Sequence, residues 1–213
     1  MKSGVRALGV AESYPGTARA EGGGRSTLAG AVVRADRVVD GLAFETCTVG
    51  GLDATDAVVR LWTDLDRPDV RYLLLAGVAP AWYNLLDLES LHERTDRPIV
   101  AVTFEPSDEP LEEALARAFS GRALERRLER FDRLPPRSRL PINDEAVFLR
   151  WVGCEPSEAR DVVRAFTPEG GRPEPLRVAR IAARAGRALR EDEFEGGDEA
   201  ETAGGDRGGD EPV

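Results

Sequence analysis

The sequence is poor in the residues that build zinc sites, disulfide frameworks and membrane spans. It holds one histidine, His92, and two cysteines, Cys47 and Cys154, which lie far apart and outside any Cys-x-x-Cys motif. Neither a zinc site nor a disulfide framework is therefore predicted. No apolar run reaches the roughly 18 residues of a membrane-spanning helix, and the N-terminus lacks the apolar segment of a signal peptide. We expect a cytoplasmic protein with buried thiols and no membrane contact.

Lysine is nearly absent as well. Lys2 stands against 28 arginines, while aspartate and glutamate are plentiful. A high-GC genome favours arginine and a salt-rich cytoplasm discourages lysine, and the balance leans to a salt-adapted source.

The net charge of −10 depends strongly on the C-terminal end. Residues 191–213 hold ten acidic residues and one arginine, are rich in glycine, and contain Phe194 as their one aromatic. Such a segment cannot bury enough apolar surface to offset the entropy of ordering it. We therefore predict one domain over residues 1–190 and a disordered acidic tail over residues 191–213.

Charge within the predicted domain is unevenly distributed. Residues 1–120 carry 12 basic and 19 acidic residues, whereas residues 121–190 carry 16 arginines and 10 acidic residues. The arginine-rich half can face an anionic partner such as nucleic acid. Alternatively, its arginines and glutamates alternate on solvated helix faces. The sequence leaves both interpretations open.

Hydrophobic periodicity predicts an α/β fold. Three β-rich runs are expected to form an antiparallel meander, and Asp53 or Thr55 can cap the helix that follows it. The meander strands lie near 5–11, 27–34 and 38–49, further strands at 70–76, 98–104 and 146–153, and helices at 51–65, 85–94, 109–133, 156–166 and about 175–190. Strands that alternate with helices favour a parallel extension of the meander. The expected architecture is a ribonuclease-H-like mixed sheet flanked by helices.

Four segments carry a family resemblance: RALGVAES (6–13), VGGLDAT (49–55), YLLLAGVAPAWYNLLDL (72–88) and FTPEGGRPEPLRVAR (166–180). Together they resemble an archaeal family of uncharacterised proteins related to endonuclease V, some of whose members are described as deoxyuridine endonucleases. The resemblance implies a ribonuclease-H-like core, a nucleic-acid substrate and Mg²⁺-assisted phosphodiester cleavage. Such cleavage needs carboxylates from neighbouring strand ends, because Mg²⁺ prefers oxygen ligands.

The chain departs from the family pattern at its acidic positions. That pattern places Asp-Asp after the first strand's Leu-Gly-Ile and Asp-Gly at the end of the fourth strand. Here Ala11 and Ala76 stand at the two expected metal-ligand positions, and Gly50 replaces a further acid. Because alanine cannot bind Mg²⁺, we expect no metal site and no cofactor.

Glu12 and Asp53 are the catalytic candidates of a nuclease that still works. The side chain of Glu12 leaves the opposite face from Ala11 if the strand continues through both residues. Asp53 is retained from the family pattern, although capping the helix at 51–65 accounts for it equally well. A nuclease built on these two residues would need Mg²⁺ or Mn²⁺.

Arg172, Glu174 and Arg177 are the first candidates for nucleic-acid binding. They gather at the start of the last helix, where guanidinium groups and free backbone N–H groups can receive a phosphate. Alternatively, Glu174 pairs with one of the arginines and locks the loop.

Three aromatic residues complete the set of candidates. Tyr14, Trp82 and Tyr83 lie in loops after the first and fourth strands, where the fold places its ligand. Stacking on a base is one role for them, and packing between loop and helix is the other. His92 lies on a charged helix without a second histidine or cysteine nearby in the sequence, which disfavours a role in metal binding.

Three functional hypotheses follow. The preferred one is a nucleic-acid-binding or damage-recognising protein, with DNA favoured over RNA, whose metal-dependent cleavage is lost or weakened because of Ala11 and Ala76. The first alternative is an active Mg²⁺-dependent endonuclease on DNA containing deoxyuridine or deoxyinosine, using Glu12 and Asp53. The second is an interaction protein with a protein partner and a vestigial cleft.

Overall fold

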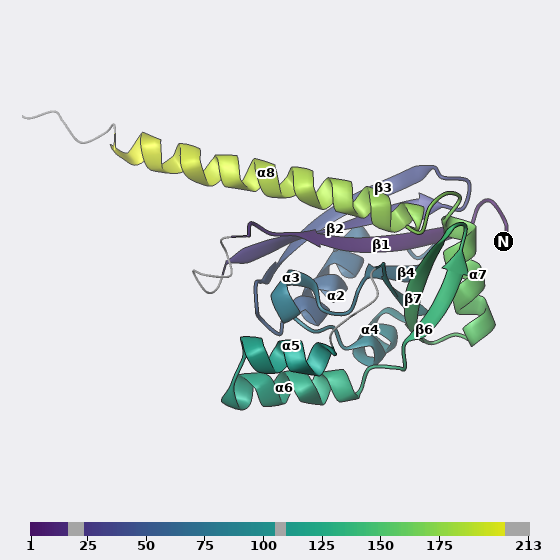
Figure 1. The fold of residues 1–213 in the computed structure, drawn as a ribbon. Helices are drawn as coiled ribbons and strands as arrows, with labels where there is room; N and C mark the ends of the chain where they lie inside the picture. The colour runs from purple at the N-terminus through teal and green to yellow at the C-terminus, as the bar shows by residue number, and fades with distance from the viewer. Residues whose placement is uncertain (17–23, 105–109, 203–213) are drawn as a thin grey trace, which may run out of the picture.

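A seven-stranded mixed sheet forms the centre of the part of the chain that the structure describes (Figure 1). The computed structural model describes residues 1–16, 24–104 and 110–202, and the backbone alone over 192–202. The strands are β1 (Arg6–Ser13), β2 (Arg25–Arg34), β3 (Val39–Thr48), β4 (Val70–Ala76), β5 (Ile99–Thr103), β6 (Ser138–Ile142) and β7 (Glu145–Val152). Their order across the sheet is β3-β2-β1-β4-β5-β7-β6.

The strand pairing confirms the predicted architecture. β1, β2 and β3 form an antiparallel meander, and β4 and β5 extend it in parallel from β1. β7 differs from the expected parallel extension, because it pairs with β5 in the antiparallel sense.

Strand β6 is an element that the sequence prediction missed. It forms a hairpin with β7, and the turn between them contains Asn143 at a φ of 49°. Pro141 lies inside β6, and proline is uncommon within strands. Proline is tolerated because β6 is the edge strand, where one side of the backbone needs no donor for a neighbour.

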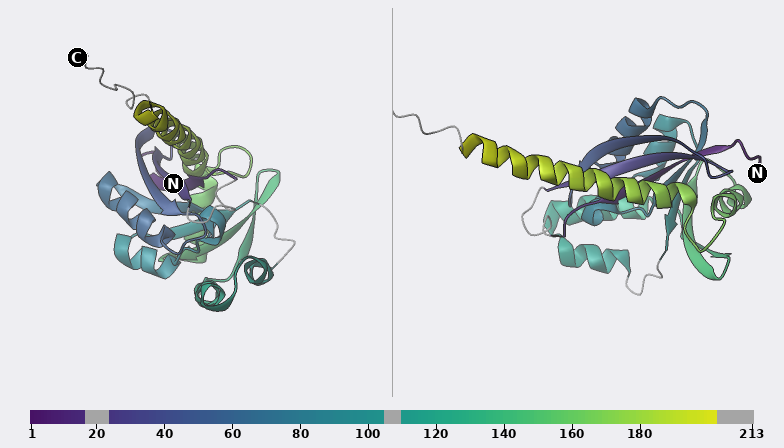
Figure 2. Two further views of the ribbon diagram at one scale, coloured as in Figure 1. Left: turned by 90° about the vertical axis from the view of Figure 1, so that its left-hand side faces the viewer. Right: turned by 90° about the horizontal axis from the view of Figure 1, so that it is seen from above.

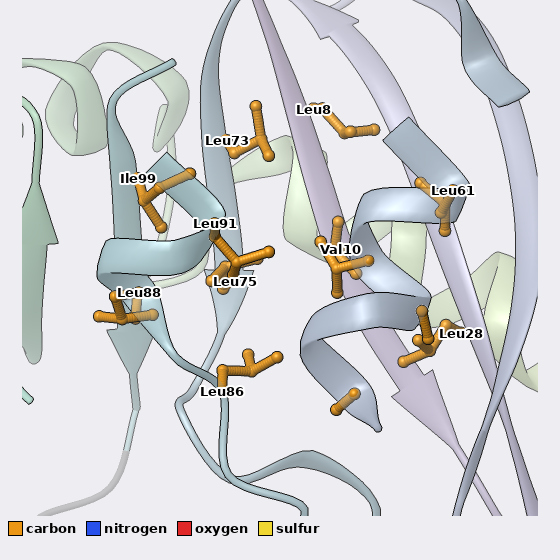
Figure 3. Packing of buried hydrophobic residues seen from close by; sticks show 14 of the residues in the cluster. Leu8, Val10, Leu28, Leu61, Leu73, Leu75, Leu86, Leu88, Leu91 and Ile99 are labelled. Carbon is orange, nitrogen blue, oxygen red and sulfur yellow. The ribbon is translucent and has the colours of Figure 1, made fainter. Parts of the chain in front are cut away.

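One face of the sheet is covered by α2 (Ala54–Leu65) and α4 (Leu88–Thr95). Figure 3 shows the core between these two helices and the sheet, in which Leu8 and Val10 of β1 lie beside Leu73 and Leu75 of β4. Leu61 of α2 packs into this core because Gly30 on β2 has no side chain, and a Cβ there would lie 2.5 Å from the leucine. Asp87 caps α4 by accepting a hydrogen bond from the Ser90 N–H at 3.1 Å.

The opposite face is covered by α7 (Pro156–Phe166) and α8 (Glu174–Thr202), as the views in Figure 2 show. α8 lies along β1 and β2 on small residues, and a Cβ at Gly9 would be 2.2 Å from the carbonyl carbon of Pro175. Glycine is therefore required at this contact between the first strand and the last helix. α8 continues past residue 190, where the tail was predicted to begin, and residues 203–213 lie outside the described residues.

The remaining helices are α3 (Pro80–Tyr83) and the hairpin of α5 (Leu111–Ala118) and α6 (Gly121–Asp132). α3 is not an ordinary helix, because Ala81, Trp82 and Tyr83 have φ angles of 47°, 55° and 61°. Three successive left-handed residues other than glycine are costly, at about 1–2 kcal/mol each, so neighbouring structure must hold this turn. Part of that support is the Gly50 N–H, which donates to the Ala81 carbonyl at 2.8 Å.

The structure also shows the surroundings of the two cysteines and of His92. Cys47 and Cys154 are both free thiols, the first buried and the second half-buried. His92 has a structural contact: its Nδ1 lies 2.8 Å from the Arg97 carbonyl oxygen. Among the described residues, no helix combines the length and apolar character that a membrane span requires.

Candidate functional site

The carboxyl ends of β1, β4 and β5 border a cavity of about 350 Å³. Ala11, Glu12 and Tyr14 line it from the end of β1 and the segment after it, and Ala76 lines it from β4. Phe104 follows β5, and Arg172, Arg180 and Arg184 come from the start of α8 and the loop before it. In α/β sheets this edge is where ligands bind, so the cavity is the candidate functional site.

The two expected metal-ligand positions lie next to each other in this cavity. Val10 pairs with Leu75 in the parallel register of β1 and β4, and Ala11 and Ala76 are the next residues on the two strands. Both present methyl groups. Among the described residues, no group of three or more histidine, cysteine, aspartate or glutamate side chains is placed to hold a metal ion. The residues present therefore do not fit a Mg²⁺ site.

Glu12 borders the cavity, but its carboxylate turns away from Ala11. It pairs with Leu28, which packs under α2, whereas Ala11 pairs with Ala29, which contacts α8. β1 continues through Ser13, so Glu12 leaves the opposite face from Ala11, as the alternation of strand side chains predicts. Its Oε2 accepts a hydrogen bond from the Ser26 hydroxyl at 3.1 Å.

Asp53 is not among the described residues that line the cavity. Its carboxylate accepts hydrogen bonds from the Thr48 backbone N–H at 3.0 and 3.1 Å, from the Thr48 hydroxyl at 2.9 Å and from Asn84 Nδ2 at 2.6 Å. Burial acts to raise the pKa of Asp53, but the hydrogen bonds from Asn84 and Thr48 outweigh it and leave that pKa lowered. The carboxylate is therefore held as an anion that ties the end of β3 to the loop after β4.

The interpretation of Asp53 as a side-chain cap of α2 is wrong. Asp53 occupies the N-cap position, but its side chain makes no capping hydrogen bond to the helix. Asn84 Oδ1 accepts from the Ala54 N–H at 2.9 Å instead. The cap comes from a residue 30 positions away along the chain.

Trp82 and Tyr83 lie away from the cavity, in an aromatic cluster with Phe119 at the end of α5. The ring centroids of Trp82 and Phe119 are 5.1 Å apart, and those of Tyr83 and Phe119 are 6.2 Å apart. Trp82 also covers Gly50, whose φ is 69° and where a Cβ would lie 2.8 Å from the indole ring. In this chain the position of the third missing acid is therefore closed to any side chain.

The cluster of Arg172, Glu174 and Arg177 divides between two neighbouring pockets. Arg172 stacks on Phe104, with the guanidinium carbon 3.6 Å from the ring centroid, and both residues line the cavity and the pocket beside it. Glu174 and Arg177 line that second pocket and form a two-point ion pair at 2.5 and 2.7 Å. The alternative in which Glu174 pairs with an arginine is therefore confirmed.

Arg180 and Arg184 are cavity residues that the sequence analysis missed. They belong to a row that also includes Arg177 and Arg187, at intervals of three, four and three residues, which places all four on one side of α8. That spacing is visible in the sequence and was the available signal. The spacing does not by itself show that these arginines line a cavity, because that depends on α8 lying along β1.

Other arginines of the basic half hold loops together. Arg127 of α6 is 3% exposed and donates to the carbonyls of Gly50, Gly51 and Tyr83, and it lies over the Phe119 ring. Arg130 donates to the Leu52 and Leu85 carbonyls at 3.0 and 2.8 Å. These two side chains fasten α6 to the loops after β3 and β4.

Solved structures share this fold. A protein of unknown function from Archaeoglobus fulgidus superposes with a TM-score of 0.72 at 25% identity, over 85% of this chain and 97% of that one. Human ENDOV superposes with a TM-score of 0.58 at 16% identity, over 88% of this chain and 86% of that one. Ciona intestinalis endonuclease V, in complex with DNA containing an inosine, gives 0.54 at 12% identity, over 88% of this chain and 86% of that one. The ribonuclease-H-like fold is thereby confirmed.

Relatives by sequence are archaeal. A UPF0215 protein of Pyrobaculum calidifontis is 36% identical over 161 residues, which cover 75% of this chain and 87% of the relative. A UPF0215 protein of Methanopyrus kandleri is 32% identical over 187 residues, covering 86% and 91%. The family model described as endonuclease dU matches residues 3–186. The chain belongs to the endonuclease dU family.

Proposed function

We propose that this protein binds nucleic acid, with DNA favoured over RNA, and that its metal-dependent cleavage is lost or severely weakened. The observation that carries the proposal is the pair of methyl groups, Ala11 and Ala76, side by side at the strand ends where the family pattern has aspartates. Two-metal and one-metal phosphodiester cleavage both depend on carboxylates that hold the cation. Neither Glu12 nor Asp53 supplies that arrangement, because one turns to the other face and the other lies outside the cavity.

Binding to nucleic acid is supported by the arginines that face the cavity and by the fold. Arg172, Arg180 and Arg184 line it against a single carboxylate among the described lining residues. Guanidinium groups match the geometry of phosphate oxygens. A structure with the same fold, Ciona intestinalis endonuclease V, holds DNA that contains an inosine.

The test combines binding and cleavage on the same substrates. Fluorescence polarisation with undamaged DNA, DNA containing deoxyuridine or deoxyinosine, and matched RNA should give binding to DNA that persists in EDTA. Gel assays of those substrates with Mg²⁺ or Mn²⁺ should show no specific nicking. Metal-dependent nicking that disappears in the Asp53→Ala variant would instead establish the active endonuclease. A protein that retains no nucleic acid at low salt, and co-purifies with another protein, would have a vestigial cleft.

We also propose that residues 1–190 form the nucleic-acid-binding domain and that the acidic residues after 190 are not needed for that binding. A chain ending at residue 190 should unfold cooperatively in denaturant and keep its affinity for DNA. Tighter binding by the shortened chain would indicate that the acidic segment competes with DNA for the arginines. Loss of cooperative unfolding would place the domain boundary further along α8.

A further inference from the structure

The cavity is electrostatically the opposite of a metal site. Where a nuclease of this fold presents carboxylates to a cation, this chain presents three guanidinium groups above two methyl groups. The one described carboxylate on the lining, Glu12, is drawn to the α2 face by its hydrogen bond with Ser26. A cation entering the cavity would meet like charges, whereas an anion would meet hydrogen-bond donors.

The pairing of the arginines along α8 singles out two of them. Arg177 is held by Glu174, and Arg187 is held by Glu191 at 3.1 Å and donates to the Ser13 hydroxyl. Arg180 and Arg184 lie between these two, and within the described part of the chain neither forms a hydrogen bond or an ion pair. The two arginines of the row that line the cavity are thus the two that have no acceptor among the described residues.

Their spacing suits a shared ligand. Arg180 and Arg184 are four positions apart, so they are neighbours on one side of the helix, about 6 Å apart along its axis. Both side chains are exposed, and both line the same cavity as Arg172, whose guanidinium is fixed over the Phe104 ring. Three donor groups therefore reach one cavity from a helix and from the loop that leads into it.

We infer that this cavity binds a phosphate group of nucleic acid directly on Arg180 and Arg184, beside Arg172, with no divalent cation between protein and phosphate. The inference rests on the proposed function and names the chemical group that its site takes. The phosphate is either an internal phosphodiester or a terminal phosphomonoester. Both share the oxygens that a guanidinium recognises, and the two differ in charge and in position on the strand.

The experiment compares two double variants of equal charge. Arg180→Gln with Arg184→Gln removes the cavity pair, and Arg94→Gln with Arg164→Gln removes two exposed arginines that pair with aspartates on α2 and α7. Affinity for a single-stranded oligonucleotide is measured by fluorescence polarisation in EDTA across a potassium chloride titration. Circular dichroism and thermal unfolding confirm that every variant is folded.

The cavity variant should bind at least about tenfold more weakly than the unchanged protein, since hydrogen bonds to charged groups are lost. Its slope of log affinity against log salt should fall by about 0.7 if both arginines hold one phosphate, and by about 1.4 if each holds its own. The control variant should lose much less affinity. Equal losses in the two variants, or wild-type binding that disappears in EDTA, would overturn the inference while leaving nucleic-acid binding in place.

The source of the phosphate is separated by the ends of the oligonucleotide. Versions with a 5′-phosphate, a 3′-phosphate or two hydroxyl ends are compared on both double variants. If the unchanged protein prefers an oligonucleotide with one phosphorylated end, and the cavity variant shows no such preference, the bound phosphate is a terminal one. If the unchanged protein binds all three oligonucleotides with equal affinity, and the cavity variant weakens binding of all three to the same extent, the bound phosphate is an internal one. If no oligonucleotide binds the unchanged protein at all, the proposed function fails and the inference fails with it.

Discussion

Helices α6 and α8 both carry many arginines, but the two helices use them differently. Arg127 and Arg130 of α6 point at backbone carbonyls of the loops after β3 and β4 and donate hydrogen bonds to them. Arg180 and Arg184 of α8 line a cavity and have no acceptor among the described residues. From composition alone, the arginines of both helices belong to one basic half of the sequence. The difference lies in what each guanidinium meets, and it separates arginines that stabilise the fold from arginines available to a ligand.

The Arg127→Gln substitution should have the largest effect on stability, and it tests whether the α6 arginines stabilise the fold. The change leaves the Gly50, Gly51 and Tyr83 carbonyls without their donor and removes the cation over Phe119. We expect the free energy of unfolding to fall by about 3 kcal/mol, because several hydrogen bonds from a buried, charged donor are lost together. Urea denaturation followed by circular dichroism measures it. A loss below about 0.5 kcal/mol, the range of ordinary surface changes, would show that α6 does not fasten these loops.

The Gly9→Ala substitution tests whether the position of α8 matters for both stability and binding. The added methyl group would lie 2.2 Å from Pro175, so the helix must shift. We expect a destabilisation of about 1–3 kcal/mol, typical of overpacking, together with weaker binding to DNA. Gly4→Ala is the matched control, because nothing lies within 4 Å of its Cβ. If both variants unfold at the same denaturant concentration, α8 is not seated on β1 as described.

Asp53→Asn examines the loop that the α6 arginines hold. An amide in place of the carboxylate presents a donor to Thr48 or Asn84, both of which donate to Asp53 in the structure. We expect a loss of about 1 kcal/mol at neutral pH. Because the pKa of folded Asp53 is lowered, this contribution is complete above the unfolded pKa of about 4 and is lost as the pH falls through the folded value.

Urea unfolding of the two proteins from pH 8 to pH 2 checks that dependence. The difference between them should stay constant down to about pH 4 and narrow below it. A difference that grows on acidification would mean that Asp53 is stabilised as the protonated form, against the network of donors around it.

The smallest effect on stability is expected for the double change Arg180→Gln and Arg184→Gln. Both side chains are exposed and make no hydrogen bond or ion pair with other described residues, so the free energy of unfolding should move by no more than about 0.5 kcal/mol. The same denaturation measurement applies. A loss of unfolding free energy similar to that of Arg127→Gln would show that the arginines of α8 stabilise the fold as much as those of α6.

Elements with local signals could be predicted from the sequence. The helix expected at 156–166 is observed as Pro156–Phe166, and the strand expected at 70–76 is observed as Val70–Ala76. The adjacency of Ala11 and Ala76 was implied by the family resemblance, and the parallel pairing of β1 with β4 agrees with it. Apolar periodicity and turn residues are properties of short segments, so these features were available without the fold.

Features that depend on distant partners could not be predicted. Asn84 caps α2 from 30 residues away, and Arg127 reaches carbonyls 76 residues before it. The left-handed turn at Ala81–Tyr83 is costly by itself and exists because surrounding contacts hold it. Arg177 and Arg187 do differ from Arg180 and Arg184 by a local signal, a glutamate three residues before one and four residues after the other. The cavity that Arg180 and Arg184 line, however, is formed by strands far away along the chain.

The contact between Gly9 and Pro175 has a consequence for how the protein is made. Ala11 and Ala76 emerge from the ribosome well before Arg172, Arg180 and Arg184. A domain generally folds as a unit, so the cavity is not complete until the start of α8 has been translated. A partly made chain therefore lacks the three arginines of the proposed phosphate site while it is surrounded by ribosomal RNA.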